Sequence, residues 1–274
     1  MDNRPIGVFD SGLGGLTAVR HLREILPNEN IVYFGDTGRV PYGTRSRDTI
    51  RRYATEDCQL LLENDVKYII AACGTVSSVS QDILESLPVP AIGVVNATAA
   101  AAIAATRNKR IGILGTAATI RSASFANALL ALDDQVIVTS TACPLFVSLV
   151  ESGWIDPNDD VAVPMVRRYL ADVKAAGVDT LILGCTHFPL LSPIIQQELG
   201  NRVTLIDSGR ETAAACAKSL QATNSLAQRN GGSAKYYVSD QPDGFSQVAE
   251  IFLGQSVEQS VEMVRPGRRE KGTL

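Results

Sequence analysis

The chain has 274 residues, 45% of them hydrophobic, so it can form one large or two modest globular domains with a real core. Acidic residues outnumber basic ones by 29 to 25, which excludes the dominant basic field of a nucleic-acid-binding surface. No apolar run approaches the roughly 20 residues of a membrane span, and residues 1–5 lack a signal-peptide core. We therefore expect a cytoplasmic protein with a small-molecule substrate and neither a nucleic acid nor a membrane as partner.

The N-terminal segment predicts a strand, a glycine-rich turn and a helix. Pro5–Phe9 is the expected strand, Asp10–Gly15 is the turn, and apolar residues then recur at helical spacing from Leu16 to Leu26. Such a turn can direct backbone N–H groups at an anion, although its glycines can equally serve the turn alone. Its spacing fits neither the dinucleotide-binding motif nor a Walker A loop, so nucleotide binding is not expected.

Two further strands follow in the first half of the chain. Ile31–Gly35 predicts the second strand, and Ser46 is a suitable N-cap for a helix that buries Cys58. Val66–Ala72 is an apolar run with no charge after its second residue, Lys67, which is typical of a strand buried on both faces of a parallel sheet, and it ends at Cys73. The small residues after Cys73 can cap a helix and hold a carboxylate.

The second half of the chain repeats this order. Arg110–Thr116 echoes Ile6–Ser11, and Val178–Gly184 echoes the third strand and likewise ends in a cysteine, Cys185. We interpret the repeat as an internal duplication. Cys143 and Cys216 are expected to be packing residues. The remaining elements are predicted as strands at 89–95, 135–139 and 203–209 and helices at about 96–107, 145–151, 159–176 and 211–220.

The predicted fold class is α/β, with two pseudo-symmetric domains, each a mostly parallel sheet flanked by helices, and an active site at their interface. A last strand at 236–239 and a helix at 245–253 are expected to cross back to the first domain. The first domain then comprises residues 1–97 and 209–274, and the second comprises residues 98–208. Residues 265–271 are expected to be disordered.

Cys73 and Cys185 follow equivalent strands, and ligands of open α/β sheets bind beyond such strand ends. This predicts one pocket with a sulfur on each side. A thiolate on one face can deprotonate a carbon acid while a thiol on the other reprotonates it, which inverts the centre. Nucleophilic acyl transfer needs only one sulfur, and no Cys-x-x-Cys motif supports a disulfide redox pair. Two-base catalysis is therefore the favoured interpretation.

The chain has only two histidines. His187, two residues after Cys185, is suited to exchange protons with a substrate or with the thiol, whereas His21 is expected on the surface of a helix. Cys185 and His187 supply only two metal ligands and no second cluster completes a site, so no metal is expected. Glu151, near a predicted helix C-terminus where an acid is mildly unfavourable, is either a site residue or a solvated surface residue.

Several ordered motifs together resemble those of bacterial glutamate racemases, in the aspartate/glutamate racemase superfamily, over nearly the whole chain. The matching stretches are Phe9–Gly15, Tyr33–Thr37 with Pro41–Gly43, Ala72–Cys73, Cys143–Leu145 with Glu151–Gly153, and Gly184–Pro189. The resemblance implies an isomerase that interconverts L-glutamate and D-glutamate without a cofactor and supplies D-glutamate for peptidoglycan. We also expect a homodimer.

The same resemblance assigns roles to individual residues. It implies that Cys73 handles the proton on the D-glutamate side and Cys185 that on the L-glutamate side, with Asp10 and His187 assisting the thiols. Asp36 and Glu151 are expected nearby. The expected substrate-binding residues are Asp10, Ser11, Tyr42, Gly43, Gly74, Thr75, Thr186 and His187.

One position departs from the family pattern, because Gly74 stands where the family usually has an Asn whose side chain contacts substrate. The lost hydrogen bond is expected to weaken binding by about 0.5–1.5 kcal/mol. Two alternatives stay open: a racemase of the same superfamily that acts on aspartate or another acidic amino acid, and a non-catalytic relative that binds a partner protein. Retention of both cysteines and of His187 argues against the second.

Overall fold

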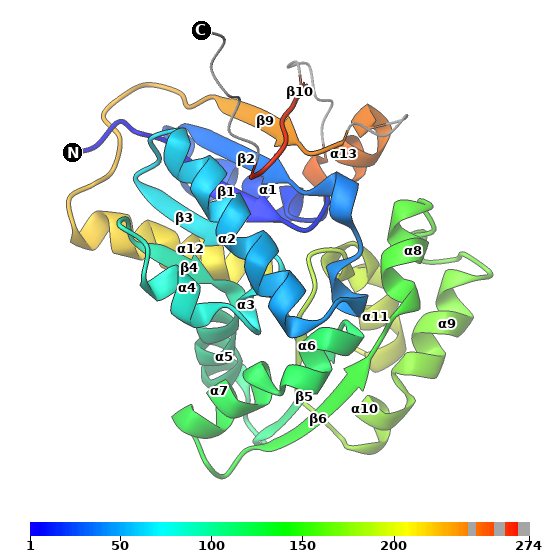
Figure 1. Ribbon diagram of the computed structural model, residues 1–274. Helices are drawn as coiled ribbons and strands as arrows, with labels where there is room; N and C mark the ends of the chain where they lie inside the picture. The colour runs from blue at the N-terminus through cyan, green and yellow to red at the C-terminus, as the bar shows by residue number, and fades with distance from the viewer. Residues whose placement is uncertain (241–244, 255–260, 268–274) are drawn as a thin grey trace, which may run out of the picture.

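The computed structural model describes residues 1–240, 245–254 and 261–267, which form two parallel β-sheets with helices on their faces (Figure 1). The α/β prediction is thereby confirmed. The first sheet has the strand order β10-β9-β2-β1-β3-β4, and the second has the order β6-β5-β7-β8. The strands are β1 (Ile6–Asp10), β2 (Ile31–Gly35), β3 (Tyr68–Ala71), β4 (Ala91–Gly93), β5 (Arg110–Gly115), β6 (Ile137–Ala142), β7 (Thr180–Leu183), β8 (Thr204–Asp207), β9 (Ala234–Val238) and β10 (Val261–Met263).

Helices connect the strands. Short 3-10 turns occur at Thr37–Arg39, Tyr42–Thr44 and Phe188–Leu191. The α-helices are α1 (Leu16–Ile25), α2 (Arg47–Glu63), α3 (Gly74–Ser77), α4 (Gln81–Glu85), α5 (Val94–Ala105), α6 (Ala117–Ser122), α7 (Ser124–Leu132), α8 (Leu145–Glu151), α9 (Ala162–Tyr169), α10 (Ala171–Ala175), α11 (Ser192–Leu199), α12 (Ser208–Ala222) and α13 (Phe245–Leu253).

The second sheet repeats the strand order of the first. The run β2-β1-β3-β4 corresponds to β6-β5-β7-β8, so β3 and β7 occupy equivalent central positions. After α12 the chain returns to the first sheet, where β9 pairs with β2 and β10 pairs with β9. The domain boundaries at 97/98 and 208/209 stay a prediction. Helix α5 spans the first of these positions and α12 begins at the second.

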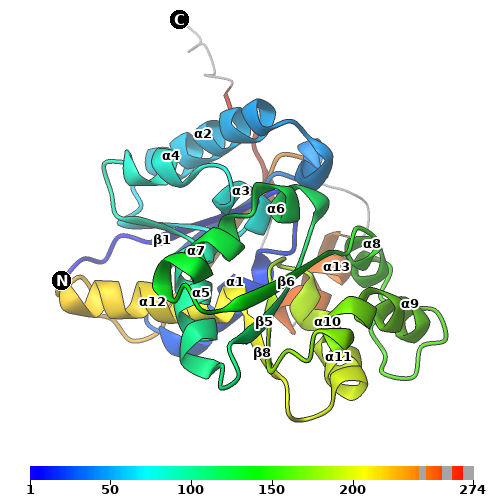
Figure 2. The same cartoon turned by 90° about the horizontal axis from the view of Figure 1, so that it is seen from below.

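Both faces of each sheet are covered, which accounts for the continuous apolar runs in the strands. In the first sheet Phe9 and Phe34 pack against α2, whereas Ile6 and Val8 pack on the other face with α1 and α12. Figure 2 shows α2 and α4 above this sheet and α1 and α12 below it. In the second sheet one face packs against α5 and α7. Each fully buried large apolar side chain contributes about 1.5–3 kcal/mol to folding.

Several element boundaries differ from the predictions, among them those of β6, expected at 135–139, and of β9, expected at 236–239. Strand β4 ends at Gly93, and Val94 already belongs to α5. Strand β8 ends at Asp207, because its carboxylate accepts hydrogen bonds from the backbone N–H groups of residues 209 and 210 and so caps α12. The helix expected at 159–176 is divided into α9 and α10, and it begins later because Asp159 accepts hydrogen bonds from the backbone N–H groups of residues 161 and 162.

The prediction that His21 lies on the surface is wrong. His21 is buried, and its Nε2 atom lies 3.0 Å from Oδ2 of Asp207 at the end of β8. Burial alone would lower the pKa of His21, but the Asp207 carboxylate raises it above its ordinary value. Helix α12 packs along α1 and covers this side of it. This contact joins parts of the chain that are 186 residues apart, so no local pattern could reveal it.

The five cysteines are buried free thiols, and Cys58, Cys143 and Cys216 lie in hydrophobic clusters, as expected. Within residues 1–240, 245–254 and 261–267, no helix combines the length and apolar character needed to cross a bilayer. Of the segment predicted to be disordered, residues 268–271 lie outside the described residues.

Candidate active site

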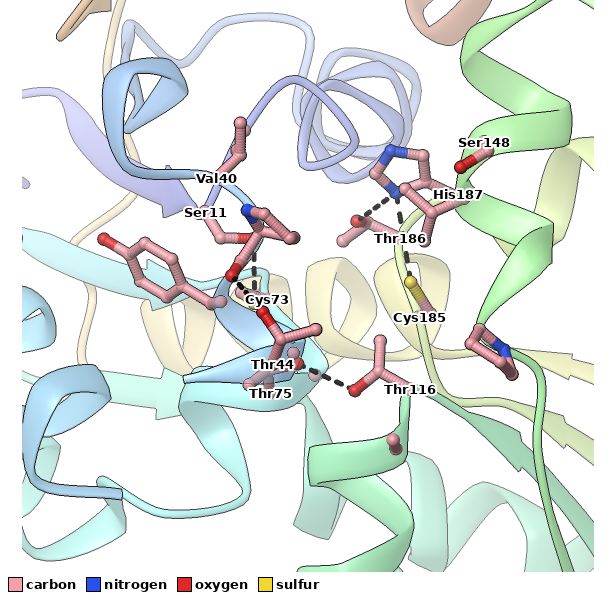
Figure 3. A pocket seen from close by; sticks show the side chains of 18 of the residues that line it. Ser11, Val40, Thr44, Cys73, Thr75, Thr116, Ser148, Cys185, Thr186 and His187 are labelled. Atoms are coloured by element: carbon pink, nitrogen blue, oxygen red, sulfur yellow. Dashed lines mark hydrogen bonds between the residues drawn. The ribbon is translucent and has the colours of Figure 1, made fainter. Parts of the chain in front are cut away.

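A pocket of about 280 Å³ lies where the carboxyl ends of strands from both sheets meet (Figure 3). From the first sheet and its loops it is lined by Ser11, Gly12, Val40, Pro41, Tyr42, Gly43, Thr44, Cys73, Gly74 and Thr75. From the second it is lined by Thr116, Ala117, Pro144, Val147, Ser148, Glu151, Cys185, Thr186 and His187. Figure 3 shows Cys73 beside Ser11 on one side and Cys185 beside His187 on the other. Both sulfur-bearing residues thus line one cavity.

Cys73 lies in a neutral, buried environment. The residue follows β3, and its thiol donates a hydrogen bond to Oγ of Ser11 at 3.3 Å. Burial, together with the nearby carboxyl group of Asp10, raises the pKa of Cys73 to about 12. The group is therefore a protonated thiol at neutral pH, able to act as an acid.

Asp10 does not line the pocket but lies behind it, fully buried at the end of β1. The backbone N–H of Gly12 donates to its Oδ2 atom at 3.1 Å. Burial raises the pKa of Asp10 above its ordinary value. The structure therefore places Asp10 where it can act on Cys73 through the electrostatic field, without lining the cavity that a substrate would occupy.

Cys185 has a cationic neighbour. Its Sγ atom lies 3.9 Å from Nδ1 of His187, whose Nε2 atom lies 3.0 Å from Oε1 of Glu151. Burial alone would lower the pKa of His187, but its hydrogen bonds to Cys185 and Glu151 raise it to about 10. His187 is therefore an imidazolium at neutral pH, so a cation lies beside the Cys185 sulfur.

Two further contacts hold the imidazole of His187 in place. Its Nδ1 atom is also 3.3 Å from Oγ1 of Thr186, and the ring of Phe252 from α13 packs edge-on against it, with 5.0 Å between ring centroids. Glu151 ends α8 and lines the pocket. Its carboxylate makes an ion pair with His187, so the structure favours the site interpretation of Glu151 over a purely solvated one.

The glycine-rich turn after β1 serves close packing. A Cβ atom at Gly14 would lie 2.3 Å from Oγ1 of Thr186, and one at Gly15 would lie 2.5 Å from Cβ of Asp10. The backbone N–H groups of residues 16–18 donate to carbonyl groups of the turn itself. These glycines therefore bring β1 and α1 against the Cys185 loop.

Tyr42 lines the pocket, but its hydroxyl group is hydrogen-bonded to the buried carboxyl groups of Asp36 and Asp57. That hydroxyl is not free to contact a ligand. Asp36 itself does not line the pocket. Thr75 and Thr116 face each other from the two sheets, with 3.0 Å between their Oγ1 atoms, and so connect the two halves at the cavity.

The sequence predictions missed several residues that line the pocket. Thr116 follows β5 as Ser11 follows β1, so the repeated segment could have identified it. Val147 and Ser148 come from α8, and no motif singled them out. Among the described residues, no group of three or more His, Cys, Asp or Glu side chains could hold a metal ion.

Comparisons with known proteins agree with this fold. A family model described as Asp/Glu/Hydantoin racemase matches residues 14–216. The chain is similar to a glutamate racemase of Neisseria meningitidis, with 47% identity over 96% of this chain and 97% of that protein. Its structure is similar to that of a glutamate racemase isoform from Bacillus anthracis, with a TM-score of 0.90, 37% identity and coverage of 96% and 98% of the two chains. It is also similar to the glutamate racemase of Francisella tularensis in complex with D-glutamate, with a TM-score of 0.89, 37% identity and the same coverage.

Proposed function

The chain belongs to the Asp/Glu/Hydantoin racemase family, and from this premise we propose that it is a glutamate racemase in which Cys73 and Cys185 are the two bases. The observation that carries the proposal is that both cysteines line one pocket from equivalent strand ends, in opposite electrostatic environments. The neutral thiol of Cys73 is set to donate a proton, and the cation beside Cys185 prepares that sulfur to accept one.

The proposed reaction from L-glutamate to D-glutamate uses each sulfur once. The thiolate of Cys185 removes the α-proton, so the C–H bond breaks and a Cys185 S–H bond forms. The electron pair left on the α-carbon delocalises into the adjacent carboxyl group. The thiol of Cys73 then donates its proton to the opposite face of the α-carbon and becomes a thiolate. The reverse reaction exchanges these roles, and transfer of one proton between the sulfurs resets the site.

His187 and Asp10 act on the two sulfurs in opposite ways. The imidazolium of His187 stabilises the Cys185 thiolate, and Glu151 in turn stabilises the imidazolium. Asp10 lies behind Cys73 and opposes a negative charge there. The Cys73 thiolate formed in each turnover is consequently a strong base, suited to remove the α-proton of D-glutamate.

Polar groups around the sulfurs are available for the two carboxylates and the ammonium group of glutamate. Ser11, Thr75 and Thr186 present hydroxyl groups at the pocket, and the backbone of Gly43 and Gly74 also lines it. We assign these groups to substrate binding. The burial of Cys73 and Cys185 keeps water from the reacting sulfurs and strengthens the electrostatic interactions between these groups.

The proposal includes a setting for the activity. A glutamate racemase supplies D-glutamate for peptidoglycan, and we propose that the protein does so in the cytoplasm as a homodimer. Depletion of the protein in its host should make growth depend on added D-glutamate. Light scattering of the purified chain should give twice the 29.2 kDa of one chain. A stable monomer with full activity would contradict the homodimer and leave the racemase activity intact.

The central test is isotope exchange. The pure protein is incubated with L-glutamate in deuterated water without pyridoxal phosphate, and D-glutamate labelled with deuterium at the α-carbon is the expected product. L-aspartate is assayed in parallel, and faster formation of D-aspartate would favour the alternative substrate. Folded protein that exchanges neither α-proton would overturn the proposal.

A further inference from the structure

Behind the pocket wall formed by residues 40–44, one arginine contacts three carboxyl groups. Nη2 of Arg39 donates to Oδ1 of Asp57 at 2.8 Å, Nη1 contacts Glu56, and Nε donates to Oδ2 of Asp36. The guanidinium also lies 4.1 Å from the ring centroid of Tyr53. Asp36 and Asp57 are fully buried. Glu56 is partly exposed, but one cation cannot balance both fully buried carboxyl groups, Asp36 and Asp57, if both are ionised.

Hydrogen-bond accounting locates a proton in this cluster. The Tyr42 hydroxyl contacts Oδ2 of Asp36 and also lies 3.1 Å from Oδ2 of Asp57, yet a phenol has only one hydrogen to donate. Two anionic oxygens cannot both be satisfied by one donor. A hydrogen on one of the two carboxyl groups, donated to the phenolic oxygen, would satisfy both contacts.

That group is Asp57. Oδ2 of Asp36 already accepts a hydrogen bond from Arg39, so it has a second donor besides the Tyr42 hydroxyl. Among the described residues, Oδ2 of Asp57 is hydrogen-bonded only to the Tyr42 hydroxyl. Burial and the nearby Asp36 carboxylate raise the pKa of Asp57 well above its ordinary value, with a smaller contribution from Glu56, against the opposing effects of Arg39 and of the hydrogen bond with Tyr42. A chain of donors thus runs from Asp57 through Tyr42 to Asp36.

The segment that these contacts hold also packs against α3, α6 and the ring of Tyr53. Residues 40–44 contain one short 3-10 turn, and the backbone bond from Arg45 to Tyr42 lies within it. Outside the segment, Gly43 packs closely on Thr116, where an added Cβ would lie 3.1 Å from that side chain. The side chains of Arg39 and Tyr42 therefore fix this wall against β2 and α2.

We propose that Asp57 is a positioning residue, held as a neutral carboxylic acid, which with Arg39 fixes Tyr42 and Gly43 against the substrate. The expected changes in KM and kcat rest on the proposed racemase function. The protonation of Asp57 does not depend on it. The positioning role predicts an effect on substrate binding with little effect on proton transfer, because within the described residues neither Cys73 nor Cys185 is hydrogen-bonded to Arg39, Asp36, Glu56, Asp57 or Tyr42.

Two substitutions of Asp57 separate the proton from the side chain. In Asp57→Asn the amide N–H donates to Tyr42 and the carbonyl accepts from Arg39, which reproduces the neutral acid. We expect a KM for glutamate within about twofold of the wild type. In Asp57→Ala both contacts are lost, and we expect KM to rise about tenfold while kcat changes less than about threefold. Asp82→Asn, which weakens the exposed Arg51–Asp82 pair that also involves α2, is the matched control and should leave both constants unchanged.

Infrared spectroscopy detects the proton directly. The spectrum of the wild type at neutral pH should contain a carboxylic-acid C=O band that is absent from Asp57→Asn and retained in Asp82→Asn. If the wild type has no carboxylic-acid band that disappears in Asp57→Asn, the proposal that Asp57 is protonated is overturned. Asp57→Ala with unchanged KM, or with a loss confined to kcat, would overturn the positioning role.

Two further measurements keep the test decisive. If Asp57→Ala does not fold, Arg39→Lys replaces it, since an ammonium group cannot reproduce the guanidinium fork, and the same rise in KM is expected. If the wild type shows no racemase activity, calorimetry of D-glutamate binding to the same variants and the infrared band still decide the inference. Failure of the proposed racemase function is thus distinguished from failure of the inference about Asp57.

Discussion

The Nδ1 atom of His187 lies 3.9 Å from the Sγ atom of Cys185, and the two groups form a buried pair at one side of the pocket. Because the pKa of His187 is raised to about 10, we expect this ring to remain protonated from neutral pH to about pH 10. An NMR titration of the two histidines should show it. His21→Gln assigns the second signal, and a His187 signal that titrates near pH 6.5 would contradict the charged pair.

The same shift makes stability depend on pH. The folded protein binds the His187 proton more tightly than the unfolded chain, whose histidines titrate near pH 6.5. The resulting stabilisation is complete below about pH 6.5 and is lost as pH rises through about 10. We expect urea unfolding of His187→Gln to lack this component of the alkaline loss of stability.

The rate of racemisation from L-glutamate should also fall as pH rises through about 10, because the Cys185 thiolate then loses the neighbouring positive charge of His187.

Replacement of either pocket cysteine should abolish racemisation. A general acid or base typically contributes about 10²–10⁴-fold to the rate, and each direction requires both sulfurs. We therefore expect Cys73→Ala and Cys185→Ala each to lower kcat by at least about 10²-fold, as measured by circular dichroism of the glutamate solution. Cys216→Ala, which removes a buried thiol on α12 away from the pocket, is the control and should retain kcat. A pocket variant with normal turnover would remove that cysteine from the mechanism.

Gly74 is expected to tolerate no side chain without movement of the backbone. A Cβ atom at this position would lie 2.2 Å from the carbonyl oxygen of Gly184, in the loop of the opposite sheet. We expect Gly74→Ala to lower the free energy of unfolding by about 1–3 kcal/mol and to raise KM, because the two loops must separate. Gly209→Ala in α12 is the control, since the nearest atom there is 3.3 Å away.

The same contact bears on the departure from the family pattern. The Asn that the family usually has at position 74 would bring its Cβ atom against the Gly184 carbonyl oxygen. We therefore expect Gly74→Asn to fail to improve the affinity for glutamate, measured as KM. A lower KM in this variant would show that the missing side-chain hydrogen bond outweighs the close contact of the two loops.

The ion pair between Lys67 and Glu29 is almost fully buried, with 2.6 Å between Nζ and Oε2. Lys67 also donates to the carbonyl oxygens of Asp2 and Ser225. Removal of one partner leaves a buried charge unpaired, so Lys67→Met should destabilise the fold by about 3–5 kcal/mol in urea unfolding. Lys109→Met breaks a solvent-exposed pair and should cost less than about 1 kcal/mol. Equal losses of stability in the two variants would contradict the burial of the Lys67–Glu29 pair.

Sequence patterns predicted those features that depend on local order. The strands before Cys73 and Cys185 are buried on both faces, so their apolar runs are continuous and their ends are recognisable. The duplicated strand order follows from segments of similar sequence. Ser46 caps α2 as its position before the helix predicts. These features made the pocket and its two sulfurs predictable from residues alone.

Contacts between side chains distant in sequence were not predictable. His21 reaches Asp207 across 186 positions, and Tyr42 and Asp57 belong to different elements whose packing decides their hydrogen bonds. The motif around Tyr42 predicted a substrate contact, but no pattern indicated that its hydroxyl is engaged by Asp36. Burial of polar groups depends on which helix covers which face, and that is a property of the whole fold.

The return of the chain to the first sheet has a consequence for synthesis on the ribosome. Strand β9 covers the outer edge of β2, yet it emerges only after all four strands of the second sheet. Until residue 238 has been made, β2 presents unpaired N–H and C=O groups, a surface to which other chains can add. The second sheet can therefore form before the first sheet is complete. A nascent chain stopped before β9 should be the species most in need of a chaperone.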